Sequence, residues 1–217
     1  MNEKRSIKSY VIRGGRLNQG RQKALNDLYD LYGLRFSEEP VDFGGSEKEV
    51  VVEIGFGVGE ALITIAEKNP EKHYIGIEVF PAGVATVLRE IHSRSIGNVT
   101  VVMHDAVEVV RHMLPDTSIR GFHIFFPDPW PKKKHHKRRL INDAFAALLC
   151  DKLKTGGYIY AVTDWDDYAS SITAVLDRAG GLIKSEKLPE DGRPVTRYEK
   201  KGMALNHEIH EILFEKM

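Results

Sequence analysis

The chain has 217 residues, enough for one well-filled core and short for two. It carries 31 Lys and Arg against 31 Asp and Glu, so any affinity for a polyanion must come from an uneven placement of charge. No apolar run approaches the ~18 residues of a membrane span, and residues 1–10 hold no apolar segment of signal-peptide type. We therefore expect a cytoplasmic protein that does not bind membranes.

The first part of the chain is basic. Residues 1–35 hold eight Lys and Arg against three acids, and they include Arg-Gly-Gly-Arg at positions 13–16. Leucines at helical spacing then predict a helix over residues 22–34. We interpret the region as a basic arm that leads to a docking helix, although a disordered start over residues 1–12 fits its composition equally well.

A domain boundary is predicted near Glu47. Residues 37–48 have the composition of a linker, with Ser-Glu-Glu-Pro followed by Gly-Gly-Ser. The predicted organisation is therefore a basic arm, helix and linker over residues 1–47 and a single domain over residues 48–217.

Beyond this boundary, apolar β-branched runs alternate with stretches of helical periodicity. Repeated strand-helix units with continuously apolar strands indicate a parallel sheet between two layers of helices. The last two strands are expected to form a pair in which one strand is antiparallel. The predicted strands cover residues 50–54, 73–77, 99–103, 121–126, 158–163, 182–187 and 208–214, and the predicted helices cover 61–68, 83–94, 107–113, 140–153 and 168–178.

Acidic side chains follow four of these strands in succession. They are Glu78, Asp105, Asp128 and Asp164, and Glu53 lies inside the first strand. Ligands of open α/β sheets bind beyond the carboxyl ends of the strands. The sequence therefore predicts one crevice that several carboxylates share.

The turn after the first strand is rich in glycine. Gly55, Gly57 and Gly59 permit the close approach of a nucleotide-like ligand to the backbone. A dinucleotide-binding motif would have a third glycine at the position of Glu60, and a carboxylate there opposes a docked pyrophosphate. S-adenosylmethionine has no phosphate and carries positive charge on its sulfonium and ammonium groups, so this donor suits the acidic crevice better than a nicotinamide cofactor does.

Two further positions fit this donor. Glu78, at the end of the second strand, is placed to accept hydrogen bonds from both ribose hydroxyls, and Asp105 with Ala106 is placed to meet the adenine. The lone Cys150 follows an apolar run, and we interpret it as a core residue rather than a catalytic thiol. No cluster of Cys and His has the spacing of metal ligands, so we expect no bound metal.

The most distinctive stretch is residues 127–139, which reads Pro-Asp-Pro-Trp-Pro and then Lys-Lys-Lys-His-His-Lys-Arg-Arg. Each proline fixes its own φ and biases the preceding residue toward extended backbone, so no helix is expected before His135. Six of the eight residues from 132 to 139 are Lys or Arg, which favours a nucleic acid as partner over a merely solvated helix start. Trp130 is interpreted either as a stacking face for an exposed base or as a hydrophobic plug under the loop.

Several of these segments together resemble the bacterial tRNA (guanine-N(7)-)-methyltransferase family. The match covers nearly the whole chain, and the Asp-Pro-Trp-Pro-Lys block that starts at Asp128 is its most specific part. The segments that carry the resemblance are residues 53–59, 76–78, 104–106, 126–132, 135–139, 163–165 and 196–199, together with residues 13–16.

The resemblance implies a Rossmann-like class I methyltransferase, with a mostly parallel seven-stranded sheet, helices on both faces and one antiparallel strand near the C-terminus. It implies a tRNA modification enzyme that transfers a methyl group from S-adenosyl-L-methionine to N(7) of the variable-loop guanine, nucleotide 46. Asp128 would be the catalytic residue. The expected state is a monomer or a homodimer.

Residue roles also follow from the resemblance, position by position. The residues expected at the cofactor are Glu53, Gly55, Gly57, Gly59, Glu78, Asp105, Ala106 and Asp128. Those expected at the guanine nucleotide are Lys132, Asp164, Thr196, Arg197, Tyr198 and Glu199, and those expected on the RNA are Lys134, His135, His136, Lys137, Arg138 and Arg139.

The chemistry of this transfer requires no proton removal, because guanine N(7) has an available lone pair. We expect Asp128 to accept a hydrogen bond from the guanine edge as the base becomes cationic, and Lys132 to contact a phosphate or the carbonyl oxygen. Both residues could instead be structural anchors of the loop. A nicotinamide-dependent dehydrogenase and a non-catalytic RNA-binding protein with the same fold are the alternative functions.

Overall fold

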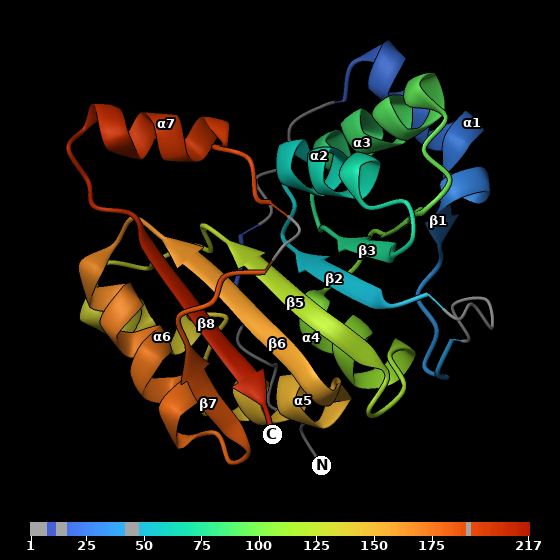
Figure 1. Cartoon of the computed structure of the whole chain (residues 1–217). Coiled ribbons are helices and arrows are strands. Elements are labelled where there is room, and N and C mark those ends of the chain that lie inside the picture. Colours follow the sequence, from blue (N-terminus) through green and yellow to red (C-terminus); the bar gives the residue numbers. More distant parts are fainter. Residues whose placement is uncertain (1–7, 12–16, 42–47, 190–191) are drawn as a thin grey trace, which may run out of the picture.

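A computed structural model describes residues 8–11, 17–41, 48–189 and 192–217. Its centre is an eight-stranded sheet with helices on both faces (Figure 1). The strands are β1 (Gly33–Leu34), β2 (Val50–Ile54), β3 (His73–Ile77), β4 (Val99–Val102), β5 (Ile119–Phe125), β6 (Leu153–Thr163), β7 (Leu182–Ser185) and β8 (His210–Lys216). Their order is β1-β4-β3-β2-β5-β6-β8-β7, and β8 alone runs antiparallel to its neighbours.

Three helices cover each face of the sheet, and a seventh, α7, lies beyond the carboxyl ends of β5 and β6 (Figure 1). Two further helical turns are a π-helix that continues α4, Val109–Met113, and a 3₁₀ helix, Lys133–Arg138. The helices on one face are α1 (Gln19–Tyr32), α2 (Glu60–Lys68) and α3 (Pro81–Arg94), those on the other are α4 (Ala106–Glu108), α5 (Asp143–Lys152) and α6 (Asp166–Arg178), and α7 is Arg197–Ala204.

Both faces of the sheet are buried, which explains why the strands read as continuous apolar runs. Successive side chains of a strand point to opposite faces, so Val52 and Ile54 of β2 join the core beneath α5 and α6. Val51 joins the core beneath α2 and α3. Glu53 shares the face of Val51, at the carboxyl end of the strand, where the predicted crevice should open.

The predicted fold class is confirmed, with one strand added. The helix predicted to continue to residue 34 ends at Tyr32, because the backbone of Gly33 is extended (φ −106°, ψ 153°). The chain then enters β1, which pairs in parallel with Val101 and Val102 of β4. This two-residue edge strand satisfies the edge of β4 and makes the sheet eight-stranded rather than seven-stranded.

Helix α7 was not predicted. It is eight residues long and its sequence, Arg-Tyr-Glu-Lys-Lys-Gly-Met-Ala, has no apolar stripe. The signal that identifies it is a capping box: the hydroxyl of Thr196 accepts from the amide of Glu199, and the carboxylate of Glu199 accepts from the amide of Thr196. A Thr-x-x-Glu pattern therefore marks a helix start that hydrophobic periodicity misses.

The described parts of residues 1–47 lie against the rest of the molecule. Leu25, Leu28 and Tyr29 of α1 pack on the core beneath α3, and β1 belongs to the central sheet. The Arg-Gly-Gly-Arg segment at 13–16 and the boundary near Glu47 fall outside the described residues. The division at residue 47 stays a prediction.

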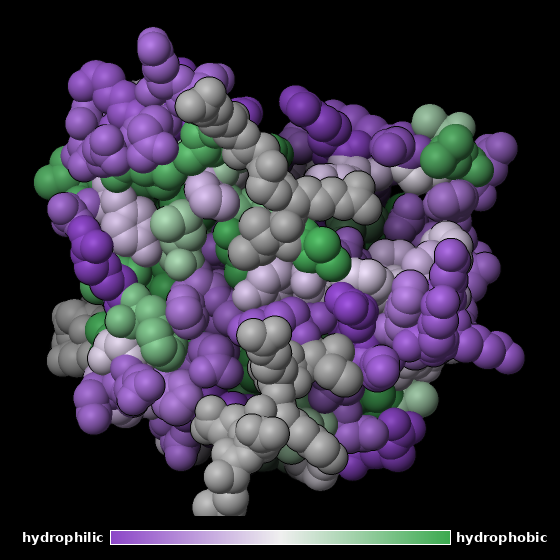
Figure 2. All heavy atoms as spheres, turned by 180° about the vertical axis from the view of Figure 1, so that it is seen from behind, coloured by the Kyte–Doolittle hydropathy of each residue, from purple (hydrophilic) through white to green (hydrophobic). Residues whose placement is uncertain are grey.

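Seen from behind, the surface is largely hydrophilic, with apolar residues in small separate patches (Figure 2). Scattered apolar residues of this kind are ordinary on a globular protein. Within the ranges that the structure describes, no helix has both the length and the apolar character that crossing a bilayer requires.

Candidate active site

A cavity of about 510 Å³ opens at the carboxyl ends of the central strands. Its walls come from the glycine turn after β2, the end of β3, the loops after β4 and β5, and the start of α7. The predicted site residues that line it are Glu53, Gly55, Gly57, Glu78, Ala106, Asp128, Thr196, Arg197 and Tyr198. The sequence thus identified a set of residues that are far apart in the chain and meet in one place.

Glu53 is the most unusual acid of this cavity. It is 3% exposed, and its Oε2 has no hydrogen-bond partner among the residues that the structure describes. Burial, and next the charge of nearby Glu78, raise the pKa of Glu53 to about 8. A buried carboxyl group in this state would be stabilised as a carboxylate by a cationic ligand.

The glycine turn and Glu78 form one backbone-bound unit. Gly57 donates its amide to Oε2 of Glu78 at 2.8 Å, and Val79 and Phe80 donate theirs to Oε1 at 2.6 and 3.0 Å. Burial raises the pKa of Glu78, while these three amides act in the opposite direction. A carboxylate has about four lone-pair sites, so Glu78 keeps room for about one further donor rather than for two strong ones.

Asp128 lies in an unusual backbone segment. Phe126 and Trp130 have φ values of 51° and 47°, in the left-handed region, although each precedes a proline. The expectation of extended backbone before these prolines was therefore wrong at both positions. Such residues cost on the order of 1–3 kcal/mol each and cluster at functional sites. Here the surroundings enforce them, since Phe126 donates its amide to the carbonyl of Val162 at 2.7 Å.

Trp130 is packed within the protein. Its Nε1 donates to the carbonyl of Ser9 at 3.0 Å, and the guanidinium of Arg138 lies 5.0 Å from the ring centroid. His135 approaches it edge-on, with ring centroids 5.9 Å apart. Because Arg138 covers one face of the ring, this geometry favours the interpretation of Trp130 as a plug over that of a free stacking platform.

The N-terminal segment contributes to the cavity, which the sequence did not predict. Ser9 and Tyr10 line it, and Nζ of Lys8 lies 2.7 Å from Oδ2 of Asp105. Asp105 is 8% exposed and also caps α4 by accepting from the amide of Val107 at 2.9 Å. It lies beside the cavity rather than in its wall, and the ion pair raises the pKa of Lys8. A single Lys in a basic arm carries no sequence signal for such a contact.

The loop after β4 is supported from the same end of the chain. The hydroxyl of Tyr29 accepts from the amide of Met103 at 3.1 Å and donates to the carbonyl of Leu34 at 2.8 Å. The ring of Phe36 stacks on His104, with centroids 4.0 Å apart, and His104 lines the cavity. Residues before the predicted boundary therefore hold the adenine side of the predicted site.

The basic tract divides into exposed and internal residues. Lys133, Lys134 and Lys137 are exposed on the 3₁₀ helix, which begins two residues earlier than predicted because the carbonyl of Lys132 accepts from the amide of His135 at 2.7 Å. Lys132 is exposed and is not among the described residues that line the cavity.

Arg139, by contrast, is 5% exposed. It donates to Asp167, contacts His136 at 3.3 Å and donates to the carbonyl of Pro129 at 3.0 Å. Its guanidinium lies 4.8 Å from the ring centroid of Tyr168. These contacts are internal, and the RNA contact predicted for Arg139 stays a prediction.

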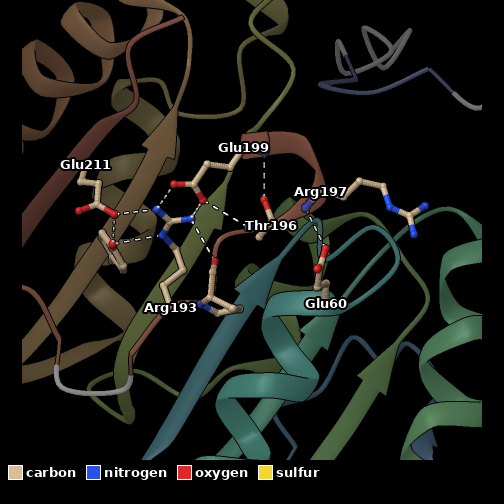
Figure 3. A network of polar contacts seen from close by, with 8 residues as sticks. Glu60, Arg193, Thr196, Arg197, Glu199 and Glu211 are labelled. Atoms are coloured by element: carbon tan, nitrogen blue, oxygen red, sulfur yellow. Dashed lines mark hydrogen bonds and ion pairs between the residues drawn. The ribbon is translucent and has the colours of Figure 1, made fainter. Parts of the chain in front are cut away.

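The last group of predicted residues surrounds α7. Thr196, Arg197 and Tyr198 line the cavity, together with Lys201, and we call these four residues the α7 wall. Asp164 lies behind this wall, 3.1 Å from Nδ1 of His207. Glu199 is 7% exposed and is paired with Arg193 (Figure 3).

Comparison with known proteins agrees with this geometry. Residues 47–212 match a protein family described as "Putative methyltransferase". A tRNA (guanine-N(7)-)-methyltransferase of Legionella pneumophila is 43% identical over 98% of this chain and 99% of its own length. Those of Methylobacillus flagellatus and Neisseria meningitidis are 41% and 42% identical, each over 98% of this chain and 92% of its own. This chain belongs to the tRNA (guanine-N(7)-)-methyltransferase family.

Solved structures support the fold of this methyltransferase. A 16S rRNA methyltransferase superposes with a TM-score of 0.59 at 11% identity, over 79% of this chain and 90% of that one. An S-adenosylmethionine-dependent methyltransferase from Aquifex aeolicus gives 0.55 at 13% identity, over 81% and 86%. At these identities the likeness concerns the fold alone. Membership of the family makes the chain a methyltransferase and sets aside the dehydrogenase alternative.

Proposed function

We propose that this methyltransferase uses S-adenosylmethionine to methylate N(7) of a guanine in tRNA, with the variable-loop guanine predicted above as its target. The three relatives named above carry the corresponding activity in their names. The observation that carries the proposal is the buried Oε2 of Glu53, which has no hydrogen-bond partner in the described structure, at a cavity that Asp128 also lines.

The residues present fit S-adenosylmethionine. At Gly55 and Gly57, with φ values of 74° and 59°, the space that a Cβ would occupy is open, so a ligand can approach the backbone there. The cavity of about 510 Å³ is of the size that holds a cofactor. Glu53 would face a cationic group of the donor, and Glu78 has room for one hydroxyl.

When bound, S-adenosylmethionine supplies an electrophilic methyl group on its sulfonium centre. The protein's task is alignment, because N(7) already has a lone pair, and orientation of this kind can contribute about 7–11 kcal/mol. Asp128, held between two left-handed residues at the rim, would accept a hydrogen bond from the guanine edge as positive charge develops on the base. Lys132 would contact a phosphate or the guanine carbonyl oxygen.

The tRNA would approach over the exposed cations of the loop that carries Asp128. Lys134 and Lys137 are exposed there and half-buried Arg138 adds positive charge, and phosphate contacts of this kind position a nucleic acid without reading its sequence. His135 and His136 remain predicted contacts at the same place. Arg139 would hold this tract on Asp167 and Tyr168, and Asp164 would support the α7 wall from behind.

The deciding experiment incubates the protein with an unmodified tRNA transcript and S-adenosylmethionine labelled in its methyl group, and then maps the labelled nucleotide. We expect the label on one variable-loop guanine. The matched control is the same transcript with 7-deazaguanine in place of guanine, which lacks N(7) and should accept no label. Label on the control transcript would rule out N(7) as the acceptor, and tRNA binding without any transfer would favour the non-catalytic alternative.

A further inference from the structure

A network of charged side chains, of which Arg193 and Glu199 are buried and Glu211 is partly exposed, lies directly behind the α7 wall. Arg193 donates from Nη1 to Oε2 of Glu199 at 2.5 Å and from Nη2 to Oε1 at 3.1 Å, and Nη2 also reaches Oε1 of Glu211 at 2.7 Å (Figure 3). The hydroxyl of Tyr160 donates to Glu211 at 2.8 Å and accepts from Nε of Arg193 at 3.4 Å. We call these four residues the Arg193 network.

The geometry of this network is restrictive. The side chains of Arg193 and Glu199 are 8% and 9% exposed, so both charges are largely removed from water. A planar guanidinium fixes a carboxylate in direction as well as distance when it binds through two parallel hydrogen bonds. The network ties Glu199 of α7 to Tyr160 of β6 and Glu211 of β8.

Helix α7 depends on such contacts for its position. Of its eight residues, all of which the structure describes, Glu199 and Gly202 alone are buried, and Tyr198 and Met203 are 65% and 56% exposed. So short a helix has little stability of its own, and it buries almost no apolar surface. Ion pairs and end caps must therefore hold it.

The start of α7 is held from a second side as well. Oε2 of Glu60, in the first turn of α2, accepts from the backbone amide of Arg197 at 2.9 Å (Figure 3). Glu60 occupies the position where a dinucleotide motif would have glycine, and its carboxylate here accepts a hydrogen bond from the start of α7. The α7 wall is thus held on one side by Glu60, next to the glycine turn, and on the other side by residues of strands β6 and β8.

Arg193 is not among the described residues that line the cavity, whereas Phe125, against whose ring it packs at 5.7 Å, is. We propose that Arg193 is a positioning residue that holds the α7 wall in the place where the guanine nucleotide is received. It acts through Glu199 and touches neither donor nor base. This inference rests on the proposed function in one respect, namely that the nucleotide received at the α7 wall is a guanine nucleotide of tRNA.

The test compares Arg193→Gln with Arg178→Gln as a matched control. Arg178 pairs with Asp143 at 2.8 Å on the exposed side of α6. Hydrogen exchange at the amides of residues 195–205 should become faster in Arg193→Gln and stay unchanged in the control. The KM for tRNA should rise or kcat should fall by about tenfold to a hundredfold, as expected for a displaced binding wall, while the Kd for S-adenosylhomocysteine changes less than about threefold.

Two further variants separate positioning from general stability. Arg193→Lys keeps the charge without the fork and should recover part of the loss, and Glu211→Gln keeps the pair with Glu199 and should show a smaller effect of the same kind. Unchanged hydrogen exchange at residues 195–205 would overturn the proposal, and so would faster exchange throughout the chain in both Arg193→Gln and Glu211→Gln. Hydrogen exchange needs no substrate, so it can be measured even if the wild-type protein is inactive. Inactivity would refute the proposed function, whereas the exchange rates would still decide whether Arg193 positions α7.

Discussion

The two walls of the cavity are built in different ways. The wall that we propose for the cofactor lies at the turn after β2 and the end of β3, and we call it the cofactor wall. It is held by the backbone: Gly55 donates to the carbonyl of Ile77 at 2.8 Å, and Glu78 accepts three amides. The wall that we propose for the substrate, at Asp128 and α7, is called the substrate wall and is held by long side chains and by left-handed residues. The first wall is fixed largely by backbone amides, and the second largely by contacts between side chains.

This difference predicts different responses to substitution. A wall of closely packed backbone has no room to adjust, so one added methyl group should disrupt it. A wall suspended by ion pairs can shift when one pair is lost, with the fold intact. Changes in the cofactor wall should therefore affect stability and donor affinity together, and changes at Asp128 or in α7 should affect catalysis more than stability.

The largest effect is expected for Gly83→Ala. A Cβ at Gly83 would lie 2.0 Å from the carbonyl oxygen of Gly57, a backbone atom that cannot move aside. We expect the free energy of unfolding to fall by about 3 kcal/mol, and donor affinity to fall with it. Gly97→Ala, where nothing lies within 4 Å of the new Cβ, is the control. Urea denaturation and titration with S-adenosylhomocysteine measure both quantities, and a Gly83→Ala protein with normal values of both would show that this wall can adjust.

Asp128→Asn comes next and tests the substrate wall. Loss of the negative charge that we propose to lie beside the guanine should lower kcat by about a hundredfold, whereas the Kd for S-adenosylhomocysteine should change little. Asp177→Asn, at an exposed acid of α6, should leave both unchanged. Single-turnover rates and calorimetry provide the two numbers. Equal losses in both would make Asp128 chiefly a cofactor ligand and would remove the distinction between the walls at this residue.

The sequence predicted the cofactor wall better than the substrate wall, and the reason is physical. Glycine spacing and an acid after a strand are local signals, so Glu53, Gly57 and Glu78 could be placed from pattern alone. The contacts of Lys8 with Asp105 and of Arg193 with Glu199 depend on where a surface segment returns to the sheet, and periodicity carries no information on that. The positive φ values of Phe126 and Trp130 oppose the local preference before proline, so only the tertiary structure could reveal them.

Glu53 makes donor binding depend on pH. Its pKa of about 8 in the ligand-free protein lies above the ordinary 4.5, so the folded state holds an extra proton between these values. Stability of the ligand-free protein should therefore fall as pH rises through this window. A cationic ligand favours the carboxylate, so binding should release a proton, and affinity should rise by up to about tenfold per pH unit below pH 8.

Calorimetry of S-adenosylmethionine binding, without tRNA, in two buffers of different ionisation enthalpy measures this proton release. Glu53→Gln cannot ionise, so it should bind with heats that do not depend on the buffer. Wild-type heats that are equally independent of the buffer would mean that Glu53 keeps its protonation state on binding. The linkage predicted for the cofactor wall would then be wrong.

The smallest effect on function is expected in the basic tract, where an exposed residue and a buried residue of the same tract can be compared. Lys134 is exposed, so Lys134→Gln should weaken tRNA binding a few-fold and reduce the slope of log K against log salt by about 1. Lys184→Gln, on the edge strand β7, is the control for an exposed lysine. Arg139→Gln should leave the slope nearly unchanged and lower stability by about 2 kcal/mol, because it leaves the hydrogen bonds with Pro129 and exposed Asp167 unmade. If Arg139→Gln lowered the salt slope as much as Lys134→Gln does, Arg139 would have to leave Asp167 and contact RNA when RNA binds. The substrate wall would then change its conformation on RNA binding rather than being formed in advance.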